Sequence, residues 1–282
     1  MFAQSFQFIF GIVLLLSSSV GLSAKIVWID TSIEHSLGRT LSKATHQHGP
    51  ALAAQVERLL GWQGNVARDL RAKDRLIVGF KVIDGKPELT AAFYRGGKLK
   101  LDALIFNGGD GRERFYDRDA KLVETQLSPN PVPDYIQVTE RVQTGRGRRR
   151  HKGIDLKADI GAPILSPIDG VVTRINWSTR YNGKCLEVRD RQGNTHRFLH
   201  LNRVAKLSTG KKIRVGYHLG EVGNTGRSSG PHLHYEITDT KGRILNPLKV
   251  IGGHRPSVSK PLRTSFNAKL NKILRRFSLR AT

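Results

Sequence analysis

The 282-residue chain contains a single cysteine, Cys185. No intrachain disulfide can form, and a zinc site built from several cysteines is excluded. The fold must therefore be stabilised by its core or by a metal bound through other side chains. A role for Cys185 as a nucleophile is not favoured, because nothing in the sequence marks a Cys–His pair.

Acidic residues are also few. The chain has 23 Asp and Glu against 47 Lys and Arg, which gives a net charge of +24. Such an excess implies anionic partners, and the candidates are nucleic acid, cell-wall polymers and anionic lipid head groups.

The apolar run at residues 8–16, FIFGIVLLL, is shorter than the roughly 20 residues that a membrane span requires. The small residues SSSVGLSA follow it, which is typical of a secretory signal peptide with cleavage after Ala24, although no Lys or Arg precedes the run. A buried first element of the fold and an uncleaved anchor are the alternatives. A signal peptide over residues 1–24 predicts export to the periplasm or cell envelope, or secretion, and leaves no nucleic-acid partner.

Residues 25–125 are predicted to form a small α+β domain. Apolar residues at helical spacing predict a helix over residues 50–60, and RLIVGFKV predicts a strand over residues 75–82. Two further apolar runs, at residues 89–94 and 99–106, flank Gly96 and Gly97 and predict a β-hairpin. Three prolines in the segment QLSPNPVPDY indicate a stiff linker over residues 126–137.

Residues 138–252 are predicted to form an antiparallel β domain, so the fold class is mainly β. Short β-like runs separated by Gly, Asn and Pro support this, among them residues 170–175, 185–188, 195–201 and 232–237. Residues 253–282 form a basic tail in which Phe266, Leu270, Leu274 and Phe277 recur at helical spacing. We favour a helix that packs on its own domain, with a solvated charged face, over one that lies on an anionic membrane or wall surface.

The segment His232-Leu233-His234-Tyr235-Glu236 has the first chemically informative pattern. In a strand, the two histidines and Glu236 share one face, while Leu233 and Tyr235 share the other and can enter a core. Glu236 could orient a metal ligand or be solvated. Of the other histidines, His35, His46 and His48 are interpreted as surface or capping residues, and His196 and His218 are expected to be exposed.

His151 and Asp155 provide two more candidate ligands, and Gly153 between them argues against a regular helix. Two imidazole nitrogens and one carboxylate oxygen suit zinc with an open fourth position. The sequence has no HExxH helix, so a helix-borne glutamate base is excluded, and His200 and His232 are the candidate bases.

Four blocks then occur in an order that resembles the lysostaphin-type (LytM-like) zinc metallopeptidases: HKGIDLKADIGAPILSPIDGVV, RFLHL, GEVGNTGRSSGPHLHYEI and LNP. The resemblance implies that His151, Asp155 and His234 bind zinc and that His200 and His232 are the catalytic histidines. It does not decide which of the two is the general base. One departure is Phe198, where the family usually has tyrosine.

The resemblance further implies an antiparallel β peptidase domain with an open groove. We expect a zinc-dependent endopeptidase, acting as a monomer, that hydrolyses peptide bonds of bacterial peptidoglycan, with stem-peptide cross-links as the favoured target. The alternatives are a catalytically silent wall-binding activator of other hydrolases and a nucleic-acid-binding protein, the latter suggested by charge and by RGRRR at residues 146–150. That arginine run has two interpretations, a solvated loop without function and a cationic rim of the substrate groove.

Overall fold

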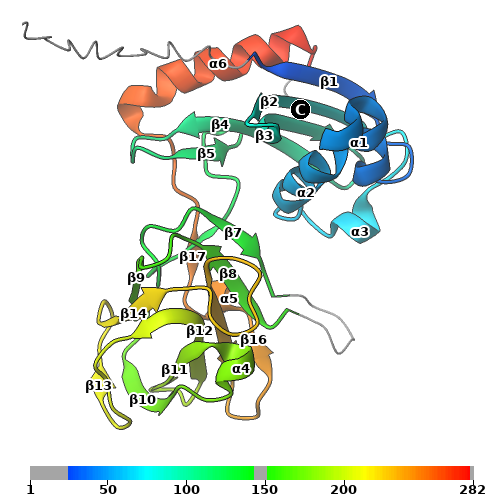
Figure 1. The fold of residues 1–282 in the computed structure, drawn as a ribbon. Coiled ribbons are helices and arrows are strands. Elements are labelled where there is room, and N and C mark those ends of the chain that lie inside the picture. Colours follow the sequence, from blue (N-terminus) through cyan, green and yellow to red (C-terminus); the bar gives the residue numbers. More distant parts are fainter. Residues whose placement is uncertain (1–24, 143–150, 280–282) are drawn as a thin grey trace, which may run out of the picture.

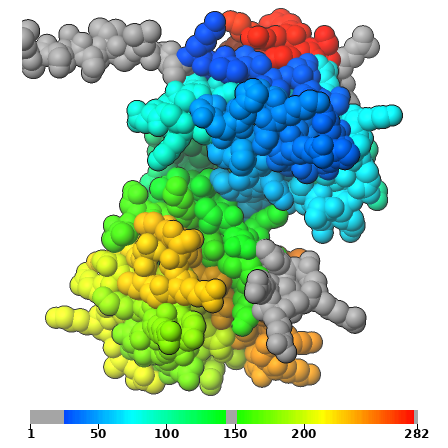
Figure 2. Space-filling model, turned by 45° about the vertical axis from the view of Figure 1, so that its right-hand side comes forward, coloured from blue at the N-terminus to red at the C-terminus, as the bar shows by residue number. Residues whose placement is uncertain are grey.

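The structure, a computed structural model, describes residues 25–142 and 151–279. The expected signal peptide and the arginine run at residues 146–150 lie outside the described residues. Two units follow one another along the chain and are stacked in space (Figures 1 and 2). Among the described helices, none has the length and apolar character that crossing a membrane would require.

The N-terminal unit is built on an antiparallel five-stranded sheet in the order β1-β2-β3-β4-β5. Its strands are β1 (Val27–Ser32), β2 (Arg75–Ile83), β3 (Lys86–Arg95), β4 (Lys100–Asn107) and β5 (Glu113–Tyr116). Three helices stand between β1 and β2: α1 (Leu37–Thr45), α2 (Gly49–Leu60) and α3 (Val66–Asp69), with the 3-10 turn η1 (His46–His48) before α2. The helix predicted over residues 50–60 and the hairpin predicted around Gly96 and Gly97 are confirmed.

The two faces of this sheet are covered by different parts of the chain. Alternate strand residues such as Val78 and Tyr94 pack with Leu52 and Val56 of α2 in one core. Their neighbours on the opposite face pack against the C-terminal helix α6 (Arg263–Arg276), which follows the 3-10 turn η2 (Lys260–Leu262). The tail thus returns to the first sheet, as the red helix in Figure 1 shows.

The apolar stripe predicted for the tail is buried in this contact. Phe266 is fully buried against the sheet, and Leu270 is 3% exposed. The charged face stays open, with Lys272 and Arg275 exposed. The helix is packed, as we favoured, but it packs on the N-terminal sheet instead of on the domain that precedes it in the chain.

The second unit is mainly β, as predicted. Its ten-stranded antiparallel sheet has the main order β13-β10-β11-β12-β15-β8-β7, while β14 pairs with β12 and β9, and β16 pairs with β15. The strands are β7 (Gln137–Glu140), β8 (Gly153–Lys157), β9 (Pro163–Leu165), β10 (Gly170–Ile175), β11 (Lys184–Asp190), β12 (Thr195–Val204), β13 (Lys212–Ile213), β14 (His218–Val222), β15 (His232–Thr238) and β16 (Ile244–Leu245). Two one-turn helices are inserted, α4 (Thr179–Asn182) and α5 (Pro247–Val250).

The core of the second unit lies on one face of this sheet. Leu233 and Tyr235 of β15 are fully buried there, together with Leu156 of β8. Val132 and Tyr135 of the proline-rich segment belong to the same core. That segment also forms β6 (Gln126–Leu127), which pairs with β17 (Gly253–His254), so it connects the two units and packs on the second one.

His196 is a correction to the sequence analysis, because it is fully buried and not exposed. Its Nδ1 lies 2.7 Å from the Tyr235 hydroxyl and its Nε2 lies 3.1 Å from Asp190 Oδ2. A buried imidazole is tolerated when both nitrogens have partners, and here both partners come from other strands or strand ends. His218 is exposed, as expected.

Candidate metal centre

The open face of the second sheet collects the candidate ligands. On β15, Leu233 and Tyr235 are buried in the core, so His232, His234 and Glu236 point to the opposite face. This is the division that the sequence pattern predicts. The core side chains fix the strand, and the strand fixes the spacing of the histidines.

Asp155 reaches the same place from the neighbouring strand β8. Its Cα is paired with that of His234 across the two antiparallel strands, and directly opposed side chains are close neighbours. Gly153, two residues earlier, lies opposite Glu236. A Cβ at position 153 would lie 2.4 Å from the Tyr235 carbonyl oxygen and 3.0 Å from His234 Nε2, so the close approach of β8 to β15 beside this imidazole requires glycine.

His151 completes a compact triangle of donor atoms. His151 Nε2 lies 3.0 Å from Asp155 Oδ1 and 3.1 Å from His234 Nδ1, and the latter lies 2.8 Å from Asp155 Oδ1. All three residues are partly or fully buried. Among the described residues, these three form the group of His, Asp, Glu and Cys side chains that can converge on one ion.

The triangle fits the dimensions of a zinc site. Zinc–ligand distances of about 2.0–2.2 Å in tetrahedral geometry require donor atoms roughly 3.3–3.6 Å apart. The observed separations are a few tenths of an ångström shorter, a difference that small side-chain rotations can close. The donor set of two nitrogens and one oxygen also suits zinc and leaves a fourth position open.

The charges of the three groups support cation binding. Burial raises the pKa of Asp155, but hydrogen bonds from His151 and His234 outweigh it and hold that pKa well below its usual range. Burial lowers the pKa of His234, but Asp155 and Glu236 overcome this and raise it to about 9. The two carboxylates therefore stay ionised and attract positive charge to the space between the ligands.

His200 and His232 lie beside the triangle without entering it. Their ring centroids are 4.9 Å apart, and the His200 ring is 6.1 Å from that of His234. His232 Nε2 is 3.7 Å from Asp155 Oδ2. The structure thus brings all five predicted site residues together: the three candidate ligands form the triangle, and the two candidate catalytic histidines lie beside it.

Backbone carbonyls fix the tautomers of both histidines. His200 Nδ1 donates to the Thr225 carbonyl at 2.9 Å, and His232 Nδ1 donates to the Gly230 carbonyl at 2.7 Å. Because a carbonyl oxygen only accepts, each Nδ1 carries the hydrogen, and in the neutral ring Nε2 has the free lone pair. Burial lowers the pKa of His200, which favours this neutral form.

The position of His200 depends on a break in strand β12. In a regular strand it would share the face of Phe198, which lies in the core, stacked on Tyr235 with ring centroids 4.9 Å apart. His200 has a φ of 66°, and at this point β12 changes its partner from β15 to β14. This left-handed residue turns the imidazole to the open face. Because Phe198 points into the core, the tyrosine hydroxyl that it lacks does not face the ligands.

A chain of charged groups supports His234 from behind. Its Nε2 lies 3.4 Å from Glu236 Oε2, and Glu236 Oε1 accepts from Arg197 Nη1 at 2.9 Å. Arg197 Nε in turn donates to Glu187 Oε2 at 2.9 Å. Glu236 contacts the candidate ligand His234, which agrees with the interpretation that it orients a ligand. Sequence reasoning missed Arg197 and Glu187, since no motif marks them.

The comparisons with known proteins agree with this geometry. Residues 149–247 match Peptidase family M23, and this range contains all five site residues. Residues 149–247 form an M23 peptidase domain. The chain is 33% identical over 242 residues to the peptidoglycan DD-endopeptidase ShyA of Vibrio cholerae serotype O1, covering 80% of the chain and 54% of that protein.

The chain is also similar to a second DD-endopeptidase and to a solved peptidase structure. The peptidoglycan DD-endopeptidase ShyC of the same organism is 28% identical over 209 residues, or 70% of the chain and 46% of that protein. The crystal structure of a zinc containing peptidase from Vibrio cholerae is 25% identical, with a TM-score of 0.40, over 81% of the chain and 72% of that structure. The chain spans about half the length of the DD-endopeptidases that it matches.

Proposed function

We propose that this chain is a zinc-dependent endopeptidase that hydrolyses peptide bonds in bacterial peptidoglycan. The observation that carries the proposal is the triangle of His151, Asp155 and His234 within an M23 domain, flanked by two histidines whose Nδ1 atoms donate to backbone carbonyls. The complete ligand set favours an enzyme over a silent wall-binding activator, since such relatives usually lack one or more zinc ligands.

In the proposed site, His151 Nε2, Asp155 Oδ1 and His234 Nδ1 would hold the zinc. When bound, zinc supplies a water with a pKa near 7 and polarises the scissile carbonyl. Asp155 neutralises part of the added charge, and Glu236 keeps the His234 ring oriented through its second nitrogen.

His200 and His232 are the proposed proton carriers. A neutral Nε2 accepts a proton from water and passes it to the leaving amine, and the other ring, when protonated, stabilises the oxyanion. Both rings have the same tautomer and both lie beside the ligands, so either can take either part.

The proposed substrate is the stem-peptide cross-link. The names of ShyA and ShyC as peptidoglycan DD-endopeptidases support a cross-link, and their similarity extends beyond the peptidase domain. A relative named L-Ala–D-Glu endopeptidase, from Bacillus subtilis, is 38% identical over 105 residues, or 34% of the chain and 32% of that protein, so a cut within the stem is the alternative. A peptidoglycan substrate implies action in the cell envelope, and the exposed basic face of α6 would suit its anionic surfaces.

Digestion of purified sacculi tests this proposal. The zinc-loaded protein is incubated with sacculi, and the products are identified by mass spectrometry, with His232→Ala as the inactive control. We expect cross-linked dimers to be converted to monomers. Shortened stems with intact cross-links would move the cut to another bond, and no released product from a zinc-loaded protein would contradict the proposed activity.

A further inference from the structure

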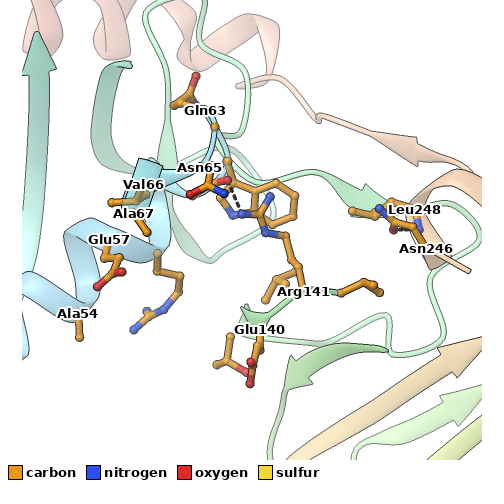
Figure 3. A pocket seen from close by; sticks show the side chains of 17 residues that line it. Ala54, Glu57, Gln63, Asn65, Val66, Ala67, Glu140, Arg141, Asn246 and Leu248 are labelled. Atoms are coloured by element: carbon orange, nitrogen blue, oxygen red, sulfur yellow. Dashed lines mark hydrogen bonds between the residues drawn. The ribbon is translucent and has the colours of Figure 1, made fainter. Parts of the chain in front are cut away.

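Arg141 connects the two units of the molecule at the edge of the proposed metal centre. It follows β7 of the second unit, yet its side chain packs on the first. The guanidinium lies over the ring of Trp62, 4.3 Å from the centroid, and Nη2 donates to the Gly61 carbonyl. A desolvated guanidinium over an indole is among the stronger contacts of this kind. Figure 3 shows Arg141 reaching toward the segment that carries Asn65 and Val66.

The backbone of the same residue contacts a proposed zinc ligand. The Arg141 carbonyl lies 3.2 Å from His151 Nδ1. The carbonyl only accepts, so this contact requires a hydrogen on His151 Nδ1, and a metal bound by the ring would then take the Nε2 lone pair on the side of Asp155 and His234. Partners of this type fix the tautomer and the ring orientation of metal-bound histidines.

Trp62 is anchored on the opposite side of this contact. It follows α2 and packs against the core of the second unit as well as the core between α2 and the first sheet. It also lines a cleft of about 1000 Å³ between the units, together with Arg141. The side chain of Arg141 is thus held by the N-terminal unit, while its carbonyl holds a ligand of the second.

We infer that the N-terminal unit positions the metal centre: Trp62 and Gly61 hold Arg141, and the Arg141 carbonyl holds His151 in its metal-binding tautomer and orientation. This inference rests on the proposed zinc site. It makes Trp62 and Arg141 positioning residues, which act through His151 and touch neither metal nor substrate.

Arg141→Met is the primary test because it keeps the aliphatic stem and removes the group that the N-terminal unit holds. Zinc affinity is measured by competition with a chelator of known affinity. We expect about tenfold weaker zinc binding, the lower end of the range for losing such a partner. The zinc affinity of Arg141→Lys should lie between those of the wild type and Arg141→Met. A lysine ammonium can donate to the Gly61 carbonyl, but it cannot cover the Trp62 ring at the same time as the planar guanidinium does.

Arg58→Met is the matched control. Arg58 crosses the same interface and donates to Gln137 Oε1 at 2.8 Å, but it has no described contact with His151. We expect its zinc affinity to equal that of the wild type. Equal zinc affinities in wild type, Arg141→Met and Arg141→Lys would overturn the inference, and so would an Arg58→Met variant weakened as much as Arg141→Met.

A second measurement separates this inference from the proposed zinc site. The tautomer of His151 is determined by NMR of nitrogen-15-labelled histidine in metal-free protein, at a pH where the ring is neutral. Asp155→Ala is introduced into both proteins, because its carboxylate would otherwise accept a hydrogen from His151 Nε2. We expect the Nδ1–H form with Arg141 and a mixture of tautomers with Arg141→Met. If the wild type binds no zinc, the proposed function fails while this comparison still tests the link. The same tautomer in both proteins would refute it.

Discussion

Glu236 offers the most quantitative test of the proposed metal centre, because it contacts the proposed ligand His234 and lies outside the group of three donors. Burial raises its pKa, but hydrogen bonds from His234 and Arg197 outweigh this and lower it to about 2, so it is a carboxylate at neutral pH. It is only 7% exposed, and its Oε2 accepts from His234 Nε2 at 3.4 Å. Two variants, Glu236→Gln and Glu236→Ala, remove its charge and its acceptor in turn.

The expected magnitude follows from what each variant leaves behind. Loss of an outer carboxylate from a metal-bound histidine weakens metal binding by about 10- to 100-fold, or roughly 1.4–2.8 kcal/mol. Glutamine keeps an oxygen that can accept from His234 Nε2, so we expect the lower end. Alanine leaves His234 and Arg197 without that acceptor, so we expect the upper end.

The assay is a competition titration with a zinc chelator, with melting temperature followed in excess chelator to separate folding from binding. Glu221→Gln is the control, since it makes the same chemical change in an exposed ion pair with Arg203 on the same sheet. Zinc affinities of both Glu236 variants within twofold of the wild type would refute the orienting role of this carboxylate.

Three other outcomes are expected. His232→Ala and His200→Ala should keep zinc and lose turnover on sacculi by about 100-fold or more, and loss of zinc in either would make that residue a ligand. Burial lowers the pKa of His196 below its ordinary 6.5 despite Asp190, so below about pH 6.5 the unfolded chain binds a proton that the folded protein resists. Unfolding in excess chelator should therefore show stability falling by up to about 1.4 kcal/mol per pH unit as pH drops, and His196→Gln, which cannot titrate, should flatten this slope; an unchanged slope contradicts the burial argument. Activity on sacculi should fall as salt rises, since exposed charges are screened beyond about 8 Å at 0.15 M. This fall should be weaker, at unchanged zinc content, in a variant that neutralises Arg146, Arg148, Arg149 and Arg150 together. An unchanged salt profile in that variant would show that these arginines do not steer the substrate.

The face of the sheet that carries the site was predictable because the information is local. Alternation along β15 separates His232 and His234 from Leu233 and Tyr235 within five residues. The pairing of His234 with Asp155 was not local, and the resemblance to a family suggested it before the register showed it. The same period-two argument would have placed His196 on the core side with Phe198, and it was the polarity of histidine that misled the prediction.

Contacts between distant segments were beyond the reach of the sequence. The amphipathic pattern predicted helix α6, but the sheet that it covers begins far earlier in the chain, and no local signal identifies it. The contacts of Arg141 with Trp62 and of Arg197 with Glu187 have the same origin. Each depends on how the strands and units come together, which a single sequence does not encode as a motif.

Anomalous diffraction at the zinc edge can show whether His151, Asp155 and His234 hold one zinc ion. Crystals of the isolated protein should show one peak bounded by His151 Nε2, Asp155 Oδ1 and His234 Nδ1, at roughly 2.0–2.2 Å from each. Asp155→Ala crystals grown with equal zinc should lack that peak, in parallel with lost activity. An active wild type without a peak there, or full occupancy in Asp155→Ala, would rule out this zinc site.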